Sequence, residues 1–491
     1  PEPRTPMFST LLEKELKAIL LSPKFVATFA VCTLLILLSV FIGIQEYKAG
    51  VEQYTTAQEL LDQEVREATS WWSIGNRAFR EPNPVQIFAA GVENDIGRFS
   101  RVNAQAPIKL QQSAYSDNPL FAFFRSIDFT FIVQVVLSLF AILFTYNAIN
   151  GERESGTLKL AFSNAVPRGQ FVAAKFAGAW LGLTIPILIP ILISMLLVMV
   201  LGVPMTGVGW SKVGMLLGAS VLYFTFFIAL GLLVSALTKH SNVSFLVLLV
   251  AWVVLVLIVP RAGTMLAGQM RPTASVAEIE SKMDRFQTER WRTFVEDQSA
   301  MWERRTAEMQ GLTGDERAEY SANNREAWDA EQSDMRAQVE IDLAEFNRKL
   351  NEELRNEKAE QERLAFTLSR FSPASSYQLT AMNLAGTNTT LKQRYEEAIF
   401  DYRDQYSAFA LQKRQEERAA QRERQRNTQG VMFLGSTDET IDASEMPRFV
   451  APVESTAEAL QPSVIDLGLL SLYGLLAFAG AFVAFLRYDV R

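Results

Sequence analysis

The residues best suited to charged contacts lie in one short segment between two long apolar stretches. The segment runs Asn150-Gly151-Glu152-Arg153-Glu154-Ser155-Gly156-Thr157-Leu158-Lys159-Leu160. Its acidic and basic side chains could form ion pairs with another surface, and Gly156 would let two backbones approach closely. Because a membrane-length run lies on either side, we expect a short connection held at a membrane surface. An ordinary capped turn would contain similar residues.

Residue types that catalyse reactions or bind metals are scarce elsewhere in the chain. There is one cysteine, Cys32, within an apolar run, and one histidine, His240, so an intrachain disulfide is excluded and zinc or haem binding is disfavoured. No Gly-x-x-x-x-Gly-Lys-Ser/Thr sequence is present, which excludes ATP binding by a P-loop. We therefore predict no catalytic residues, no metal site and no cofactor on this chain.

Composition places parts of the chain in lipid and parts in water. The 491 residues include 21% charged ones, yet the mean hydropathy is positive, at +0.09. Charged and apolar residues must therefore be segregated along the sequence. The net charge of −7 disfavours nucleic-acid binding, which usually requires a basic surface.

Six stretches are long and apolar enough to cross a bilayer as helices, which takes about 20 residues each. They are residues 25–44, 129–148, 176–201, 213–237, 243–260 and 464–486. The first stretch is too long for a cleaved signal peptide and follows an amphipathic segment within residues 1–24. The sequence thus predicts an all-α, multi-pass membrane protein.

Basic residues in the short connections orient the six spans. Most lie on one side of the predicted membrane, namely Lys14, Lys17, Lys24, Arg153, Lys159, Arg168, Lys175, Lys239, Arg487 and Arg491. The short loop 202–212 on the other side has only Lys212. The positive-inside rule then places residues 1–24, 149–175, 238–242 and 487–491 in the cytoplasm. Two large insertions, 45–128 and 261–463, would lie outside, as in a bacterial inner-membrane protein facing the periplasm.

Polar residues within the spans are few. Gln134 would either form an interhelical hydrogen bond or contact a substrate, and Pro186 and Pro190 would either kink the third span or serve as a gating hinge. No ionisable residue lies in the middle of a predicted span, since Asp128 and Asp466 are at span edges. Ion-coupled carriers usually need such a group, so energy for transport should come from a separate motor.

The second insertion shows the 3.6-residue periodicity of long helices. We predict helices over 276–310, 315–369 and 389–426, with a break at Gly311-Leu312-Thr313-Gly314. Apolar residues line one face of the second helix (Val339, Leu343, Phe346, Leu350, Leu354) and a seam on the third (Tyr395, Ile399, Tyr402, Tyr406, Phe409). Such stripes favour an elongated, coiled-coil-like hairpin or bundle.

This pattern resembles the permease subunits of ABC-2-type transporters. That family has six spans, an amphipathic helix before the first span, and a first cytoplasmic loop like Glu-Arg-Glu-x-Gly-Thr-Leu followed by Pro-x-x-Arg and a lysine. Here Phe8–Leu21 corresponds to the helix, and Glu152–Leu158, Val166-Pro167-Arg168 and Lys175 correspond to the loop. The large insertions after the first and fifth spans resemble the subgroup with a DUF3526 region, as do Phe371-Ser372-Pro373, Ala385-Gly386-Thr387 and Asn118-Pro119-Leu120.

The resemblance implies a role for the loop and for the spans. Residues 151–168 would contact a separate cytoplasmic ABC ATPase that binds ATP and Mg²⁺, through Glu152, Arg153, Glu154, Ser155, Gly156, Thr157 and Arg168. The permease would pair with a second copy or a paralogue in the lipid bilayer. The pathway would be formed by the first, second and fifth spans, and Gln134, Pro186 and Pro190 are the pathway or gating candidates.

Three functions remain open at this point. The complex could export or extract a substrate, which the sequence does not identify. It could instead transmit mechanical work to a periplasmic or envelope partner without passing a substrate through the spans. A membrane-anchored scaffold without a motor is the third alternative.

Overall fold

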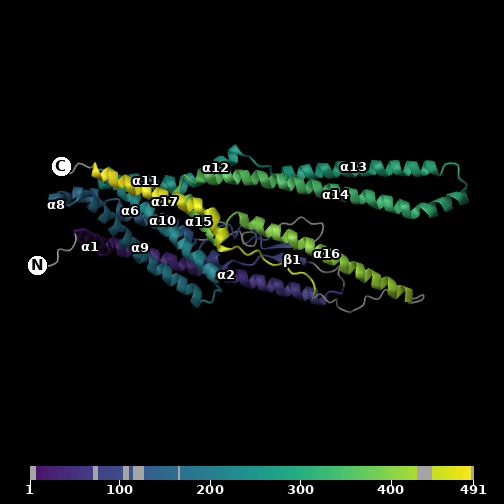
Figure 1. The fold of residues 1–491 in the computed structure, drawn as a ribbon, viewed down its shortest axis with the longest axis horizontal. Coiled ribbons are helices and arrows are strands. Elements are labelled where there is room, and N and C mark those ends of the chain that lie inside the picture. Colours follow the sequence, from purple (N-terminus) through teal and green to yellow (C-terminus); the bar gives the residue numbers. More distant parts are fainter. Residues whose placement is uncertain are drawn as a thin grey trace. The chain divides into compact units, whose positions relative to one another are not determined.

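The computed structural model describes residues 7–69, 76–102, 110–113, 127–163, 166–427 and 445–487 (Figure 1). It divides into two compact units, one formed by Pro1–Ile258 with Ser372–Arg491 and the other by Val259–Phe371. Nearly all regular structure in the described part is helical, which confirms the all-α prediction. The exception is an antiparallel pair of short strands, β1 (Asn76–Phe79) and β2 (Phe99–Val102).

Six helices among the described residues are long and apolar enough to cross a membrane, as predicted. They are Pro23–Glu67, Phe129–Glu154, Arg168–Val200, Gly207–Leu237, Ser241–Met270 and Thr456–Leu486. The first, third, fourth and sixth are α2, α9, α10 and α17. The second comprises α5 (Phe129–Phe131), a π-helical turn η2 (Ile132–Leu137), α6 (Ser138–Thr145) and α7 (Asn150–Glu154). The fifth comprises α11 (Ser241–Trp252), a second π-helical turn η3 (Val253–Ile258) and α12 (Val259–Met270).

The first span is part of a much longer helix than the predicted residues 25–44. Helix α2 continues through 45 residues to Glu67, because the segment after the apolar run is rich in Gln, Glu, Ala and Leu and contains no proline. Its start is well defined: Ser22 Oγ accepts a hydrogen bond from the backbone N–H of Phe25, and Pro23 occupies the first turn.

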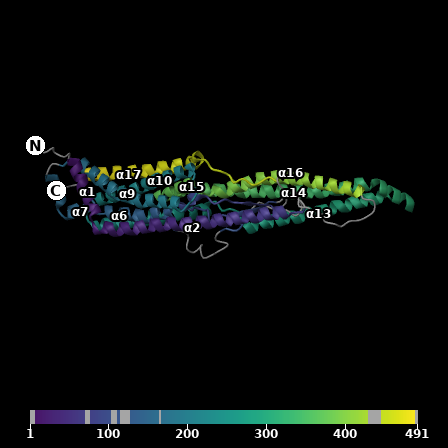
Figure 2. The same cartoon turned by 90° about the horizontal axis from the view of Figure 1, so that it is seen from below.

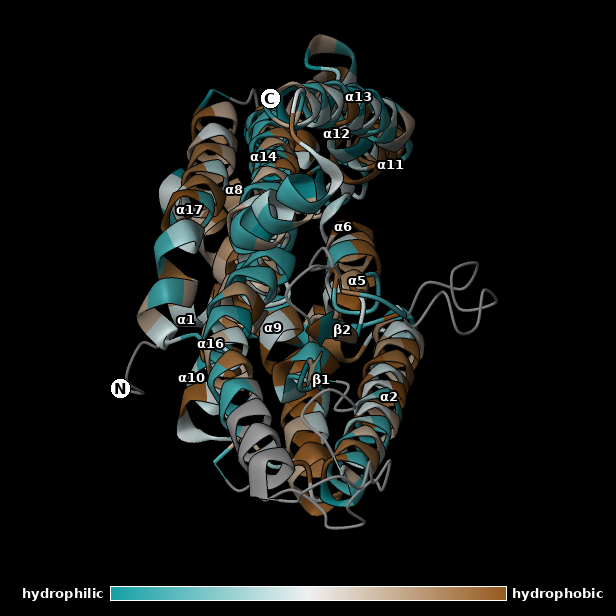
Figure 3. Ribbon diagram, turned by 90° about the vertical axis from the view of Figure 1, so that its right-hand side faces the viewer, coloured by the Kyte–Doolittle hydropathy of each residue, from teal (hydrophilic) through white to brown (hydrophobic). Residues whose placement is uncertain are grey.

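Helix α10 is the most enclosed of the six spans. It packs against α6, α15 (Pro373–Ala385) and α17. Gly231 allows the contact with α6, because a Cβ atom there would collide with the side chain of Thr145. Colouring by hydropathy shows α5 and α6 as mainly hydrophobic, whereas α14 (Gly314–Ser369) and α16 (Thr390–Asn427) are mainly hydrophilic (Figure 3).

The amphipathic segment before the first span forms α1 (Met7–Leu20), which packs along α9. Two glycines of α9 provide the groove. A Cβ atom at Gly178 would lie 2.5 Å from the Cβ of Glu15, and one at Gly182 would contact Leu16 and Ile19. The backbones of α1 and α9 are therefore close, and Glu15 lies directly over α9.

The second insertion is divided, unlike the single helical domain predicted over 261–463. Only Val259–Phe371 forms a separate unit, composed of α12, α13 (Val276–Glu308) and α14. The bounds of α13 and α14 lie within two residues of the predicted ones. Val339 and Leu350 of the predicted stripe are buried, and Phe346 stacks on Phe286 of α13 with ring centroids 3.9 Å apart. Figure 2 shows α13 beside α14.

Residues from Ser372 onward belong to the same unit as the chain up to Ile258. Helix α15 begins at the Ser372 cap with Pro373, ends at Gly386 in the left-handed conformation (φ 72°), and packs between α10 and α17. Its many small residues and Tyr377 fit this buried position. The sequence alone does not indicate this buried helix, because Ser-Pro and Ala-Gly are common in turns.

The apolar seam of α16 packs against the two strands rather than against another long helix. Ile399, Tyr402 and Tyr406 share a buried cluster with Ala78 of β1 and Val102 of β2. The Tyr402 hydroxyl accepts a hydrogen bond from Asn76 Nδ2 (2.6 Å) and donates one to the Pro447 carbonyl (2.9 Å). Tyrosine suits this interface because its ring is buried while its hydroxyl finds polar partners.

Candidate functional site

The charged segment folds into two short helices, α7 and α8 (Thr157–Ser163), joined by a tight turn. Gly156 has a φ of +75°, a left-handed conformation that side-chain-bearing residues rarely adopt. No other part of the described chain would meet a Cβ atom at this position. Gly156 is thus required for the turn, and its outer side is open.

Glu152 is the centre of a partly buried ion-pair network. Its Oε1 atom lies 2.7 Å from Lys14 Nζ of α1 and 2.7 Å from Lys175 Nζ of α9. Lys175 also contacts Glu15 Oε1 at 2.8 Å. The side chains of Glu152 and Glu15 are 14% exposed and that of Lys175 is 5% exposed. Two carboxylates and two ammonium groups therefore join α1, α7 and α9. Solvent screens Glu15, Glu152 and Lys175 weakly, whereas the Lys14 side chain is 53% exposed.

Glu154 caps the helix that begins the fifth span. Its carboxylate accepts hydrogen bonds from the Ser241 backbone N–H (2.9 Å) and the Ser241 hydroxyl (2.6 Å). His240 Nδ1 lies 3.5 Å from the same carboxylate. His240 occupies the cap position of α11, but its own side chain makes no capping hydrogen bond. Glu154 therefore supplies the negative charge that favours a helix N-terminus.

Asn150 attaches the start of the segment to α10. Its amide nitrogen donates to Thr238 Oγ1 (3.0 Å), and its amide oxygen accepts from Ser235 Oγ (3.2 Å) and Ser241 Oγ (3.3 Å). Ser235 Oγ also accepts from the backbone N–H of Ile149 (3.0 Å). Asn150 and Ser235 are fully buried, so this end of the segment is fixed to the ends of α10 and α11.

Arg168, at the start of α9, also forms a hydrogen bond within the chain. Its Nη1 atom donates to the backbone carbonyl of Leu486, the last residue of α17, at 2.7 Å. A cation at a helix C-terminus satisfies an unpaired carbonyl and the helix dipole. Glu152, Glu154 and Arg168, all predicted to contact a partner, thus hold the segment to four helices of its own chain.

The opposite face of the segment is exposed. Arg153, Ser155, Thr157 and Lys159 are exposed on this face, and the Leu160 side chain is 67% exposed. The other face of α8 packs on the bundle: Leu158 is buried, and the ring of Phe162 contacts those of Phe171 in α9 and Phe485 in α17. The segment therefore has an anchored inner face and an outer face, here called the outer ridge, formed by Arg153, Ser155, Thr157, Lys159 and Leu160.

The other predicted residues lie along the spans, away from this segment. Gln134 is in η2, where its backbone carbonyl accepts a hydrogen bond from the Tyr223 hydroxyl at 2.9 Å and its side chain is half-buried. Helix α9 continues through Pro186 and Pro190 and packs mainly on α1 and α2. Whether these three residues contribute to a pathway stays a prediction.

Sequence analysis did not identify Glu15 as a member of the network. Lys14 and Lys175 had been noted only as basic residues on the cytoplasmic side and as part of the loop pattern. The available signal was Lys175 itself, since a lysine near the start of an apolar span requires a nearby carboxylate if it is buried. The identity of that carboxylate depends on the position of α1, which the sequence does not reveal.

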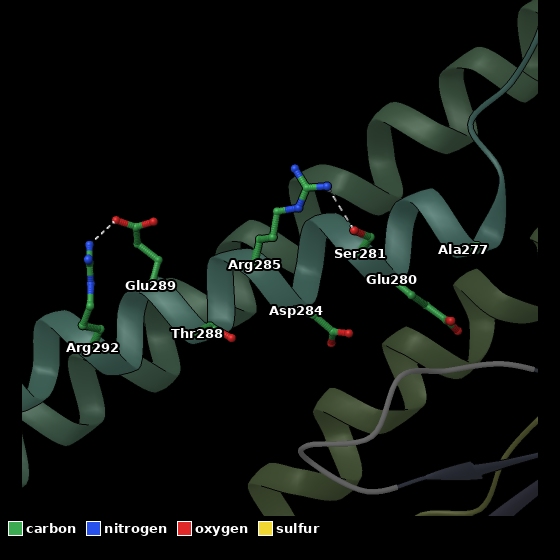
Figure 4. Close-up of a pocket in the computed structure, with 8 residues that line it drawn as sticks. All are labelled: Ala277, Glu280, Ser281, Asp284, Arg285, Thr288, Glu289 and Arg292. Atoms are coloured by element: carbon green, nitrogen blue, oxygen red, sulfur yellow. Dashed lines mark hydrogen bonds and ion pairs between the residues drawn. The ribbon is translucent and has the colours of Figure 1, made fainter.

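The described residues contain no cluster of metal ligands. Within the described ranges, no three His, Cys, Asp or Glu side chains gather closely enough to bind a metal ion. A shallow surface depression along α13 is lined by one helix face, on which Arg292 pairs with Glu289 and Arg285 with Ser281 (Figure 4). These side chains satisfy one another along a solvated helix and do not converge on a common point.

Six apolar spans, with a charged and anchored connection after the second, form the framework of a multi-pass membrane protein. The chain matches the ABC-2 family transporter protein model over residues 9–490. It belongs to that family and is a multi-pass membrane protein. Members are membrane transport components that generally lack catalytic activity, and membership implies an ATPase partner. Comparison with curated proteins finds no match.

The family match covers almost the whole chain, but it identifies only the family and not a subgroup within it. The predicted resemblance to permeases with a DUF3526 region therefore stays a prediction. Two of its motifs border α15, at Phe371-Ser372-Pro373 and at Ala385-Gly386-Thr387. The third, Asn118-Pro119-Leu120, lies outside the described residues.

Proposed function

We propose that this chain is the permease subunit of an ATP-driven transporter, coupled to a separate cytoplasmic ABC ATPase through residues 151–168. The observation that supports this most strongly is the ion-pair network of Lys14, Glu15, Glu152 and Lys175. A loop that only connected two spans would not need partly buried charges bonded to two other helices. A loop that transmits force would need them.

The two faces of the segment have different tasks in this proposal. The outer ridge docks on the ATPase through the Arg153 and Lys159 charges and the Leu160 side chain. The inner face transmits displacement, because Glu152 is bonded to α1 and α9 and Glu154 to α11. ATP-driven closure of two ATPase subunits then shifts three helices together and reopens the bundle on the other side.

The proposed setting is a bacterial cytoplasmic membrane with both termini in the cytoplasm and a second permease, identical or related, as partner. Export or extraction is the proposed direction. The single basic residue of the outer loop 202–212 is consistent with this orientation. Lys212 is buried and contacts Glu454 Oε2 at 3.2 Å, so its charge is neutralised within the chain.

A second candidate function is mechanical action on an envelope partner, and the Val259–Phe371 unit favours it. Its long helices α13 and α14 are cross-linked by Arg290 with Asp342 (2.6 Å) and by Arg305 with Glu331 (2.9 Å). The Arg305 guanidinium is buried between the rings of Trp302 and Trp328, at 5.3 and 5.0 Å from their centroids. Such a braced hairpin could transmit force outside the membrane.

Copurification with variants of the outer ridge tests the proposed coupling. The tagged protein would be isolated from its native membrane in mild detergent as wild type and as Arg153→Glu with Lys159→Glu. Lys282→Glu with Arg292→Glu is the matched control, because it reverses two exposed charges on α13. Copurified proteins would be identified by mass spectrometry, and ATPase activity would be measured.

We expect an ABC ATPase with wild type and with the control, and its loss from the outer-ridge variant. Equal yields from all three would show that docking occurs elsewhere. The absence of any ATPase from wild type would favour the scaffold. If coupling holds, an ATPase whose turnover is unchanged by any candidate substrate but depends on an envelope protein would favour mechanical action.

A further inference from the structure

Helix α15 is a short helix that lies inside the span bundle. It packs on α10 and α17 and also contacts both π-helical turns, η2 and η3. The ring of Tyr377 stacks on that of Tyr223, near the middle of α10, with centroids 4.8 Å apart. The Tyr377 hydroxyl lies 3.0 Å from Ser220 Oγ. Helix α15 therefore reaches well into the bundle rather than covering its end.

Three hydroxyl groups of α15 have no hydrogen-bond partner among the residues that the structure describes. The side chains of Ser375, Ser376 and Thr380 are buried, with residue exposures of 4%, 0% and 0%, and their oxygen atoms are unpaired. A buried hydroxyl normally finds a partner, and the requirement is stricter where lipid excludes water. Three unpaired hydroxyls on a helix of 13 residues are unfavourable in this conformation.

The spans around α15 also depart from regular helix at its level. A π-helical turn leaves backbone carbonyls without their usual intrahelical partners, and such turns are frequent at functional sites. In η2 the Gln134 carbonyl accepts the Tyr223 hydroxyl, and in η3 the Leu255 carbonyl accepts the Ser372 hydroxyl at the start of α15. Polar groups from the second, fourth and fifth spans thus surround this helix.

Helix α17, which packs on α15, contains a buried carboxylate. Asp466, predicted at a span edge, is fully buried, and Ser463 one turn earlier is buried with it. Both lie on the α17 face that is turned into the bundle. Helix α17 therefore contributes buried polar side chains to the interior of the bundle.

We propose that α15 is the polar wall of a water-filled path that opens in a second conformation of the bundle. In that conformation Ser375, Ser376 and Thr380 are hydrated, and the two π-helical turns allow the second and fifth spans to move away from α15. The structure described here is the closed conformation. This inference rests on the proposed function only in taking ATP turnover as the event that opens the path.

The single native cysteine makes this proposal testable by thiol accessibility. Cys32 is buried and would be replaced by alanine to give a background without thiols. Single cysteines would then be introduced as Ser375→Cys, Ser376→Cys and Thr380→Cys. Two controls complete the set: Ala381→Cys on the fully buried apolar side of α15, and Ser333→Cys on the exposed surface of α14. A charged, membrane-impermeant methanethiosulfonate would be applied to the complex with its ATPase, with and without ATP.

The expected result is labelling of the three hydroxyl positions about tenfold faster during ATP turnover than without ATP, as for a tenfold rise in the open population. Ala381→Cys should stay unlabelled, and Ser333→Cys should react at one rate throughout. Turnover without any labelling of the three positions would overturn the proposal. So would equal labelling of Ala381→Cys, because it would indicate general loosening of α15.

Failure of the proposed function has a different signature. If no ATPase associates with the chain, the same variants would be labelled over hours in the membrane without ATP. Slow labelling of the three positions alone would support the hydrated conformation in a chain without a motor, and no labelling would overturn it. A further variant, in which Ser376→Ala and Thr380→Val are added to Ser375→Cys, guards against misfolding of the cysteine variants. Because it lacks two unpaired hydroxyls, its labelling at Ser375→Cys should be slower. An unchanged labelling rate would count against the proposal.

Discussion

The charged loop and helix α15 differ in whether their polar side chains have hydrogen-bond or ion-pair partners. In the loop, Glu152, Glu154 and Arg168 each contact a partner on another helix, although the Oε2 atom of Glu152 is buried without one. In α15, three hydroxyls are enclosed without partners among the described residues. Satisfied charges hold an element in one position, whereas unsatisfied hydroxyls favour any conformation that supplies partners. The comparison suggests that the loop moves as a rigid attachment and that α15 changes its surroundings.

The largest effect should come from breaking the charged network. Glu152→Ala leaves Lys175 buried with one carboxylate fewer, and loss of one partner from a buried ion pair costs about 3 kcal/mol. We expect a lower melting temperature in detergent by scanning fluorimetry, with a smaller change for Glu152→Gln. The exposed pair of Glu13 with Lys17 offers the control Glu13→Ala, which should leave the melting temperature nearly unchanged. Equal effects at the two positions would contradict a structural role for the network.

A smaller and local effect is expected at the cap of α11. Glu154→Ala removes the acceptor of the Ser241 backbone N–H, so the first turn of α11 should fray. Hydrogen exchange of the amides from Ser241 onward should become severalfold faster in the variant, while exchange in α13 stays the same. Global unfolding, or no change at α11, would show that Glu154 does not act as this cap.

The ion pairs between α13 and α14 should make the stability of that helical hairpin depend on pH. The pKa of Glu331 is lowered from its ordinary value, first by its hydrogen bond from Arg305 and also by the charge of Arg304. A carboxylate whose pKa is lower in the folded state stabilises the protein at pH values above its unfolded-state pKa, about 4.3. This stabilisation is lost as the pH falls through the folded-state pKa. The protection factors of the amides near Trp302 and Trp328, which correct for the intrinsic pH dependence of exchange, should therefore fall as the pH is lowered from about 5 to about 3. Glu331→Gln should remove most of that pH dependence.

The smallest expected effect is on the melting temperature after removal of α15 hydroxyls, and it should be opposite in sign to that of Glu152→Ala. Ser376→Ala with Thr380→Val removes two hydroxyls that lack partners and keeps nearly the same shape, which is neutral or stabilising by up to about 1 kcal/mol. The melting temperature should stay equal or rise, in contrast to Glu152→Ala. A clear decrease would mean that these hydroxyls have partners in the resting protein.

The sequence was most informative where structure depends on local periodicity. The bounds of α13 and α14 follow from apolar spacing, the break near Gly311 and the capping pair of Thr313 with Glu316. The six spans follow from hydropathy alone. The placement of α15 could not be predicted, because Ser372-Pro373 is typical of a turn and its burial depends on α10 and α17, which are far away in sequence.

The candidate site was predictable in position but not in its partners. Alternating charges around Gly156 indicate a surface connection, whereas the contact between Glu152 and Lys14 joins residues 138 positions apart. The direction in which a carboxylate points depends on the packing of α1 against Gly178 and Gly182. Glu152 and Glu154 contact the chain itself, whereas Arg153, Ser155 and Thr157 of the predicted set lie on the exposed outer ridge. Contact of these residues with a partner stays a prediction.

The length of α2 has a mechanical consequence. Its 45 residues form one unbroken helix of about 67 Å, from the Ser22 cap to a region that packs on β1. A rod of this length amplifies motion: a tilt of about 5° about one end displaces the other by about 6 Å. Gly43, near the middle of the rod, lies against the backbone of Ile87. A tilt of about 5° about that contact would move both ends by about 3 Å in opposite directions, without any change in the helix itself.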